Sequence, residues 1–77
     1  MRIHGVVKSG GRPVEGAYIT LNQQNTFIAE RRTGADGMYE FNTTPGEWML
    51  ICRSSGNDAI ERSINSTDET LVVDFEL

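Results

Sequence analysis

A period of two decides the fold, and it is clearest in residues 37–53, GMYEFNTTPGEWMLICR. Residues 38–42 and 47–53 each place large apolar side chains at every second position, as strands with one buried face do. Pro45 and Gly46 fit the two central positions of a type II turn, because proline presets φ and glycine accepts a positive φ. The stretch therefore predicts two short strands joined by a tight turn. The side chains expected to face inward are Tyr39, Phe41, Trp48, Leu50 and Cys52.

The same alternation extends over the rest of the chain, and turn signals separate its segments. Gly10-Gly11, the polar residues 22–25 and Gly34-Ala35-Asp36-Gly37 interrupt it. The last of these is the strongest signal, since Asp-Gly supplies the positive φ that a tight hairpin needs. No stretch shows the spacing of an amphipathic helix. The predicted strands are residues 2–8, 14–23, 26–32, 38–42, 47–53, 59–65 and 70–77.

Short strands with turn signals about every 8–12 residues predict an all-β fold, a seven-stranded antiparallel β-sandwich. A chain of 77 residues has room for one domain, residues 1–77. Its two sheets must share a single core because few large apolar side chains are present. The predicted core consists of Ile3, Val7, Ala17, Ile19, Leu21, Phe27, Tyr39, Phe41, Trp48, Leu50, Val73 and Phe75.

Composition excludes several classes of function. The net charge is -4, and of the seven basic residues only Arg31-Arg32 are adjacent, so we expect no nucleic-acid partner. The longest apolar run, Trp48–Cys52, is far shorter than the roughly 20 residues of a membrane-spanning helix, so we expect no membrane partner. Residues 1–5 show no secretory signal. If Met1 is the native start, the protein is expected to be cytoplasmic.

Four short motifs resemble those of the carboxypeptidase regulatory-like domain, a transthyretin-like (prealbumin-like) β-sandwich with an immunoglobulin-like Greek key. They cover almost the whole chain and fix turns or core positions. The resemblance implies this fold and a non-catalytic accessory or folding-assisting module. The motifs are Ile3-x-Gly5-x-Val7, Gly11-Arg12-Pro13-Val14-x-Gly16-Ala17-x-Ile19-x-Leu21, Gly37-x-Tyr39-x-Phe41 and Pro45-Gly46-x-Trp48-x-Leu50.

A further set of residues is similar to a family of small uncharacterised bacterial proteins of this fold, often encoded beside sulfurtransferases. This likeness implies a role near sulfur metabolism and leaves open an accessory protein that uses Cys52. The opening strands and glycines also resemble the N-terminal domain of some phage side tail fibres, which implies the alternative of a structural or attachment domain. The residues of the bacterial likeness are Gly16-Ala17, Phe27-x-Ala29-Glu30, Pro45-Gly46-x-Trp48-x-Leu50 and Gly56-Asn57.

Few residues could support catalysis. His4 is the lone histidine and Cys52 the lone cysteine, so they cannot supply the three or four ligands of a zinc site. No nucleophile-elbow motif frames Ser54, Ser55 or Ser63. By parity His4 faces outward, whereas Cys52 faces the core, where a thiol behaves as a small hydrophobe. We expect no catalytic residue, no cofactor and no metal.

The transthyretin-like superfamily includes one hydrolase branch, which acts on a purine-degradation intermediate. Proteins of that branch are tetramers, and they have several histidines and arginines and a characteristic C-terminal tetrapeptide. This chain has one histidine and ends in Asp74-Phe75-Glu76-Leu77. The resemblance therefore implies that this chain is not an enzyme.

Outward-facing apolar residues favour binding to a protein. A fully solvated sheet face would have more lysine, threonine or glutamate at these positions. We predict an interaction patch with Met49 and Ile51 at its centre, for an unknown protein partner or for self-association; pairing through open edge strands is the other route. The patch is predicted to contain Met49, Ile51, Tyr18, Val6 and Val72, and Ile28 is a further outward apolar residue.

Overall fold

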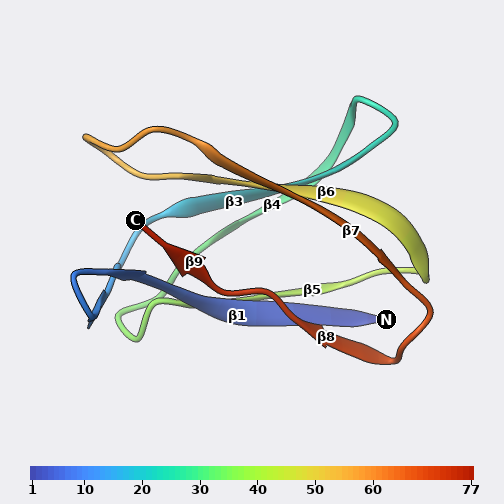
Figure 1. Cartoon of the computed structure of the whole chain (residues 1–77), viewed down its shortest axis with the longest axis horizontal. Coiled ribbons are helices and arrows are strands. Elements are labelled where there is room, and N and C mark those ends of the chain that lie inside the picture. Colours follow the sequence, from blue (N-terminus) through green and yellow to red (C-terminus); the bar gives the residue numbers. More distant parts are fainter.

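The computed structural model is a sandwich of two β-sheets, and every regular element in the described part of the chain is a strand (Figure 1). The structure describes residues 1–77, except for the side chain of Ser66. None of the described residues form a helix long and apolar enough to cross a membrane. The strands are β1 (Arg2–Ser9), β2 (Arg12–Pro13), β3 (Tyr18–Gln23), β4 (Thr26–Arg32), β5 (Met38–Asn42), β6 (Gly46–Arg53), β7 (Ile60–Ser66), β8 (Thr70–Val72) and β9 (Phe75–Glu76).

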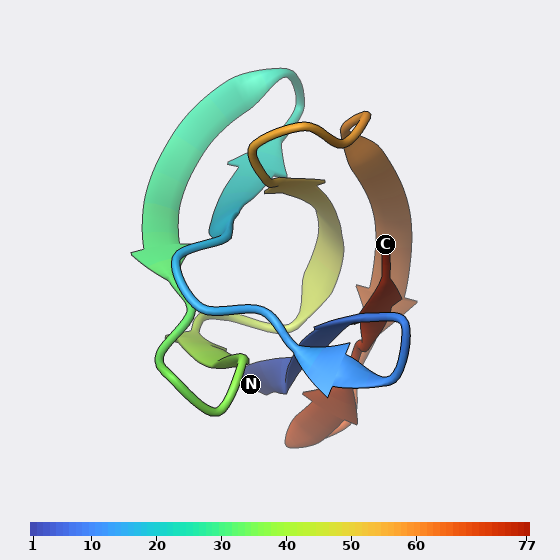
Figure 2. The same cartoon turned by 90° about the vertical axis from the view of Figure 1, so that its left-hand side faces the viewer.

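One sheet has four antiparallel strands in the order β4-β3-β6-β7. The other is built around β1, which pairs with β2 and β5 antiparallel and with β8 and β9 parallel. Figure 2 shows the four-stranded sheet curving over the smaller five-stranded one. The two-sheet sandwich is confirmed; the parallel pairing of the C-terminal strands with β1 was not predicted.

Two predicted strands differ from those of the structure. Residues 14–23 were expected to be one strand, but Gly16 adopts a φ of 81° and bends the chain, so that β3 begins only at Tyr18, and β2 is an additional strand before residue 14. Residues 70–77 were expected to be another, but Val73 and Asp74 separate β8 from β9. Nine short strands therefore replace the seven predicted.

The turn at Asp36-Gly37 is present but is not a hairpin. Gly37 has a φ of 74° and its N–H donates to Gly34 O at 2.9 Å, as a tight turn requires. The flanking strands β4 and β5, however, lie in different sheets, so the turn is a corner between layers. The β3–β4 hairpin instead turns at Gln24 and Asn25, whose φ values of 51° and 62° are both left-handed.

The core confirms the predicted list with two exceptions. Trp48 is buried, and its indole N–H donates to Thr44 O at 2.9 Å. Val73 is only partly buried, and Phe27 is 58% exposed. The buried apolar residues are Ile3, Val7, Ala17, Ile19, Leu21, Tyr39, Phe41, Trp48, Leu50, Cys52 and Phe75.

The prediction for Phe27 is wrong because of a β-bulge. Leu21 pairs with Ala29, but the next residue, Asn22, pairs with Phe27, so Ile28 is left as an extra residue on β4. An extra residue reverses the alternation beyond it. Phe27 therefore lies level with the outward-facing Asn22 instead of facing the core with Ala29.

A close approach of two backbones over Gly5 explains the break between β8 and β9. A Cβ on Gly5 would lie 1.9 Å from Val73 O, a distance that no side chain tolerates. The Tyr39 hydroxyl donates to the same Val73 oxygen, and Val6 N–H donates to Asp74 Oδ1 at 2.9 Å. The C-terminal segment thus packs closely against β1 at the one position of that strand that has no side chain.

Two arginines cover the open sides of the sandwich. Arg31 on β4 lies over the ring of Phe41 at 5.3 Å, and Arg62 on β7 lies over the ring of Phe75 at 5.9 Å. Both pair in register with buried residues of the neighbouring strand and so point toward the opposite sheet. Inward-pointing charges on edge strands oppose the addition of another strand. Both edges of the four-stranded sheet are therefore protected.

Candidate protein-interaction surface

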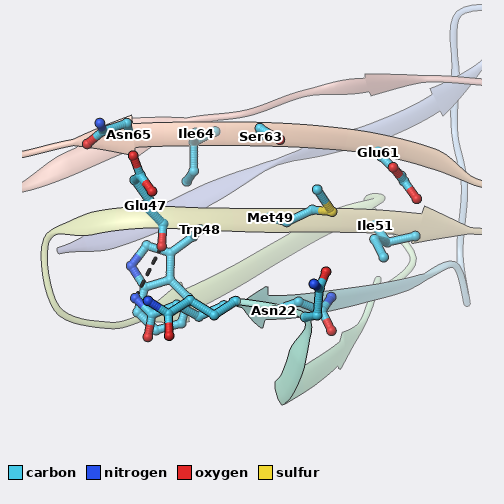
Figure 3. A pocket seen from close by; sticks show the side chains of 12 residues that line it. Asn22, Glu47, Trp48, Met49, Ile51, Glu61, Ser63, Ile64 and Asn65 are labelled. Carbon is cyan, nitrogen blue, oxygen red and sulfur yellow. Dashed lines mark hydrogen bonds between the residues drawn. The ribbon is translucent and has the colours of Figure 1, made fainter.

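The outer face of the four-stranded sheet is hollowed into an open groove of about 690 Å³ that runs over β3, β6 and β7 (Figure 3). Met49 and Ile51 project into it from β6, between Ser63 on β7 and Asn22 on β3. Both apolar side chains are only partly buried. The centre predicted for an interaction patch therefore lies on the floor of this groove.

The register of the strands explains why Met49 remains uncovered. Met49 pairs with Asn22 on one side and with Ser63 on the other, and both neighbours have short polar side chains. The Asn22 amide also donates from Nδ2 to Thr20 Oγ1 at 3.2 Å, which holds it along β3. With small neighbours on both sides, the central strand presents its apolar side chains to solvent.

The charges around the groove are separated along β6. Glu47 and Glu61 line the groove, and both are exposed. Arg53 lies at the far end of β6 on the same face, beside Tyr18 on β3. Among the described residues, no ion pair involves Glu47 or Arg53. Along β6 the apolar floor is thus bounded by the unpaired Glu47 at one end and the unpaired Arg53 at the other, and Glu61 of β7 lies beside Ile51.

The predicted patch does not form one surface. Tyr18, Met49 and Ile51 share the outer face of the four-stranded sheet. Val6 on β1 and Val72 on β8 lie on the outer face of the other sheet. Alternation distinguishes outward from inward positions, but it does not indicate to which sheet a strand belongs. The predicted patch therefore combined residues from two opposite faces.

Some residues of these faces were missed by the sequence analysis. Phe27, turned outward by its bulge, joins the face of Met49, while Met38, which is 47% exposed, joins the face of Val6. Ser63 was considered only as a nucleophile, although its small size is what opens the groove beside Met49. The alternation placed Met38 outward, but nothing in the sequence marks the bulge.

The structure does not bring the chemistry-bearing residues together. Cys52 is fully buried, and burial raises the pKa of its thiol. His4 lies on the outer face of the other sheet, in register with Glu40 and Val72. No cluster of three or more potential metal ligands occurs among the described residues. Within the described part of the chain, His4 and Cys52 therefore lie on different sheets, with one outward and the other inward.

The family model described as a protein of unknown function (DUF1416) matches residues 1–75. The chain belongs to this family. It is also similar to the structure of Klebsiella pneumoniae 5-hydroxyisourate hydrolase, with a TM-score of 0.83 and 18% sequence identity over 100% of this chain and 89% of the hydrolase. No curated protein matches the chain. At this identity the hydrolase shows a shared transthyretin-like fold and nothing about activity.

Proposed function

We propose that this DUF1416 chain is a non-catalytic protein-interaction module that binds through the outer face of its four-stranded sheet. The observation that supports this most directly is the groove in which Met49 and Ile51 stay partly exposed between unpaired charges. Apolar surface surrounded by polar side chains is typical of protein-binding sites on small domains.

The arrangement of the carboxylates favours binding over catalysis. Paired carboxylates act as general acid and base where a closed site excludes water and separates their pKa values. Glu47 and Glu61 are both exposed in an open groove. Glu47 pairs in register with Asn65 and Glu61 with Ile51, so the two carboxylates stand at opposite ends of the groove. They are better placed to attract a partner than to share a substrate.

A sulfur-carrier role for Cys52 is less well supported. A reactive cysteine needs an exposed thiolate in an electropositive environment. The Cys52 side chain has no exposed surface, and burial raises the pKa of its thiol, so the thiolate is disfavoured. A partner would have to open the core to reach the sulfur atom.

The test uses a double variant, Met49→Lys with Ile51→Lys, which replaces the two apolar residues of the groove floor by lysine. The wild type, immobilised and incubated with extract of its native host, is expected to retain a defined partner or a second copy of the chain that the double variant loses. The measurement is quantitative mass spectrometry of the retained proteins. Circular dichroism checks that the double variant still folds.

Met38→Lys is the matched control, because Met38 is an exposed methionine on the opposite face. It is expected to retain the same proteins as the wild type. If all three chains retain the same proteins, the groove is not the binding surface and the proposal is wrong.

A further inference from the structure

Opposite charges stand at equal distances from the middle of β6. Glu47 and Arg53 both point outward, and each is three residues from Leu50. Met49 and Ile51, the two apolar residues of the groove floor, lie between them. Along β6 the outward side chains are therefore an acid, two apolar residues and a base, in that order. In a second β6 strand that runs in the opposite direction, the acid and the base exchange places and the two apolar residues stay in the centre.

This pattern is complementary to itself. We infer that the groove face binds a second copy of the same chain, with the two β6 strands facing each other antiparallel across a two-fold axis; this rests on the proposed function of the groove. Glu47 of one chain then meets Arg53 of the second copy, and Met49 meets Ile51 of the second copy. A two-fold axis forms every contact twice, so one pair of residues supplies two ion pairs.

The charges also select the direction of pairing. If the two β6 strands ran parallel, Glu47 would face Glu47 of the second copy and Arg53 would face Arg53 of the second copy. Like charges placed together oppose association and so act against the wrong arrangement. The antiparallel arrangement also leaves the sheets nearly aligned, as in most face-to-face sheet packing.

The remaining surfaces are less suited to a second copy. The edge strands β4 and β7 have the inward-pointing Arg31 and Arg62, which oppose strand addition. On the opposite face the Arg2 guanidinium already pairs with Glu40 at 2.6 Å, so that pair is not free for a partner. Figure 1 shows the sandwich from its side, so the outer face of the four-stranded sheet spans the longest and the shortest of the 31 × 23 × 15 Å extents. A face of this size suits a weak, reversible dimer with less than the roughly 800 Å² per partner of a standard interface.

The experiment exchanges the charges in the full chain, first one at a time. Glu47→Arg puts two basic residues at the ends of β6, and Arg53→Glu puts two acidic ones there. Each single variant is expected to weaken the homodimer about tenfold or more, because attraction at both ends becomes repulsion. Sedimentation velocity and native mass spectrometry at micromolar to millimolar protein measure the dimer dissociation constant.

Mixing the two single variants gives the decisive result. An equimolar mixture of Glu47→Arg and Arg53→Glu is expected to form a heterodimer, because the mixed pair has an acid opposite a base at both ends. Its dissociation constant is expected within about threefold of the wild-type value, as is that of the double variant with both charges exchanged. Neither result follows if the two substitutions merely disturb the fold.

Glu15→Arg and Arg12→Glu are matched controls, since they make the same changes of net charge on exposed residues at β2 and the loop that follows it. They are expected to leave the wild-type dimer unchanged. A wild type that remains monomeric at millimolar concentration overturns the second-copy inference. The inference is also wrong if the dimer dissociation constant does not change in Glu47→Arg and Arg53→Glu, or if Met38→Lys abolishes the dimer.

The failure of this inference can be told apart from the failure of the proposed function. If the wild type is monomeric, yet Met49→Lys with Ile51→Lys loses a host protein that Met38→Lys retains, the groove binds a different protein and only the second-copy inference is wrong. If the wild type is monomeric and no retained protein depends on the groove, both are wrong.

Discussion

The two outer faces of the sandwich both expose apolar side chains, yet they differ in their charges. On the four-stranded sheet, Met49 and Ile51 lie between Glu47 and Arg53, which have no ion-pair partner among the described residues. On the five-stranded sheet, the Arg2 guanidinium donates from Nε to Glu40 Oε1 at 2.6 Å. On that second face Met38 and Val72 are exposed and Val6 is partly buried.

This difference shows that exposed apolar area is a weak guide to a docking surface. Single exposed apolar residues are normal on soluble proteins and need no partner. Both faces meet that description, and by exposed fraction Met38 and Val72 would rank above the partly buried Met49. What distinguishes the groove face is its larger hollow, about 690 Å³ against about 380 Å³ beside Val6, in which two apolar side chains lie between opposite charges of one strand.

The largest effect is expected from Gly5→Ala, because this substitution disrupts the close approach of the C-terminal segment to β1 that completes the five-stranded sheet. The new Cβ would meet Val73 O at 1.9 Å, and the obstacle is backbone rather than a flexible side chain. We expect a loss of about 3 kcal/mol or more in the free energy of unfolding. Urea denaturation followed by Trp48 fluorescence measures the loss.

Gly10→Ala is the control for this prediction. Gly10 has a positive φ of 58° but nothing within 4 Å of an added Cβ, so its cost is conformational, about 1–2 kcal/mol. If Gly5→Ala is no more destabilising than Gly10→Ala, the close approach over Gly5 does not hold the C-terminal strands.

A smaller effect is expected from Tyr39→Phe, which removes the hydroxyl bound to Val73 O and leaves that partly buried carbonyl without this donor. The expected loss is about 1–3 kcal/mol. Tyr18→Phe, on the exposed tyrosine of the groove face, is the control and should change stability by about 0.5 kcal/mol or less. Equal losses for the two variants would contradict the role of the Tyr39 hydroxyl.

The ionisation of Tyr39 should also make the free energy of unfolding depend on pH in the alkaline range. Burial, with smaller contributions from Asp74 and Cys52, raises the pKa of Tyr39 above its usual value. The folded state then keeps a proton that the unfolded state loses, so this stabilisation is complete below the unfolded pKa of about 10 and declines as the pH rises above it. Wild type should show this decline in urea titrations above pH 10, and Tyr39→Phe should show less of it.

The smallest effect is expected from Glu40→Gln, which makes the second face resemble the first by leaving Arg2 unpaired. The hydrogen bond from Arg2 lowers the pKa of Glu40, and the charges of Arg2 and His4 act in the same direction. A lowered folded pKa stabilises the fold above the unfolded pKa of about 4.3, and this contribution is lost as the pH falls through the folded value. The wild type should melt slightly higher than Glu40→Gln at pH 7.

At pH 2–3 the two melting temperatures should converge, because the carboxyl group is then protonated in both states of the wild type. A difference that stays constant from pH 7 to pH 2 would show that Glu40 acts through packing instead of through its charge.

The sequence predicted the sandwich, most of the core and the inward position of Cys52, because each follows from local alternation. It did not predict which sheet a strand joins, since that depends on pairings between distant residues. The corner at Gly37 illustrates this limit: the turn chemistry was identified correctly, but the sheets on its two sides were not. Val6 and Met49 were likewise assigned to one patch although they lie on opposite faces.

The candidate surface was predicted in its centre and missed at its margins. Met49 and Ile51 were identified because apolar residues at outward positions break the pattern of a solvated sheet. Phe27 was misplaced because one extra residue at a bulge reverses the alternation, and no residue type marks that bulge. The unpaired charges of Glu47 and Arg53 became meaningful only when the structure gave neither an ion-pair partner among the described residues.

The place of β1 has a consequence for how the molecule is made. This first strand is flanked on one side by β5 and on the other by β8 and β9, whose parallel pairing joins Val7 to Phe75. During synthesis, therefore, β1 cannot complete its sheet until β8 and β9 have been made. Chains with such distant pairings fold slowly, on a scale of milliseconds to seconds. Residues 1–77 reach their native arrangement only after Phe75 has been synthesised, and removal of residues 75–77 leaves β1 without one of its neighbours.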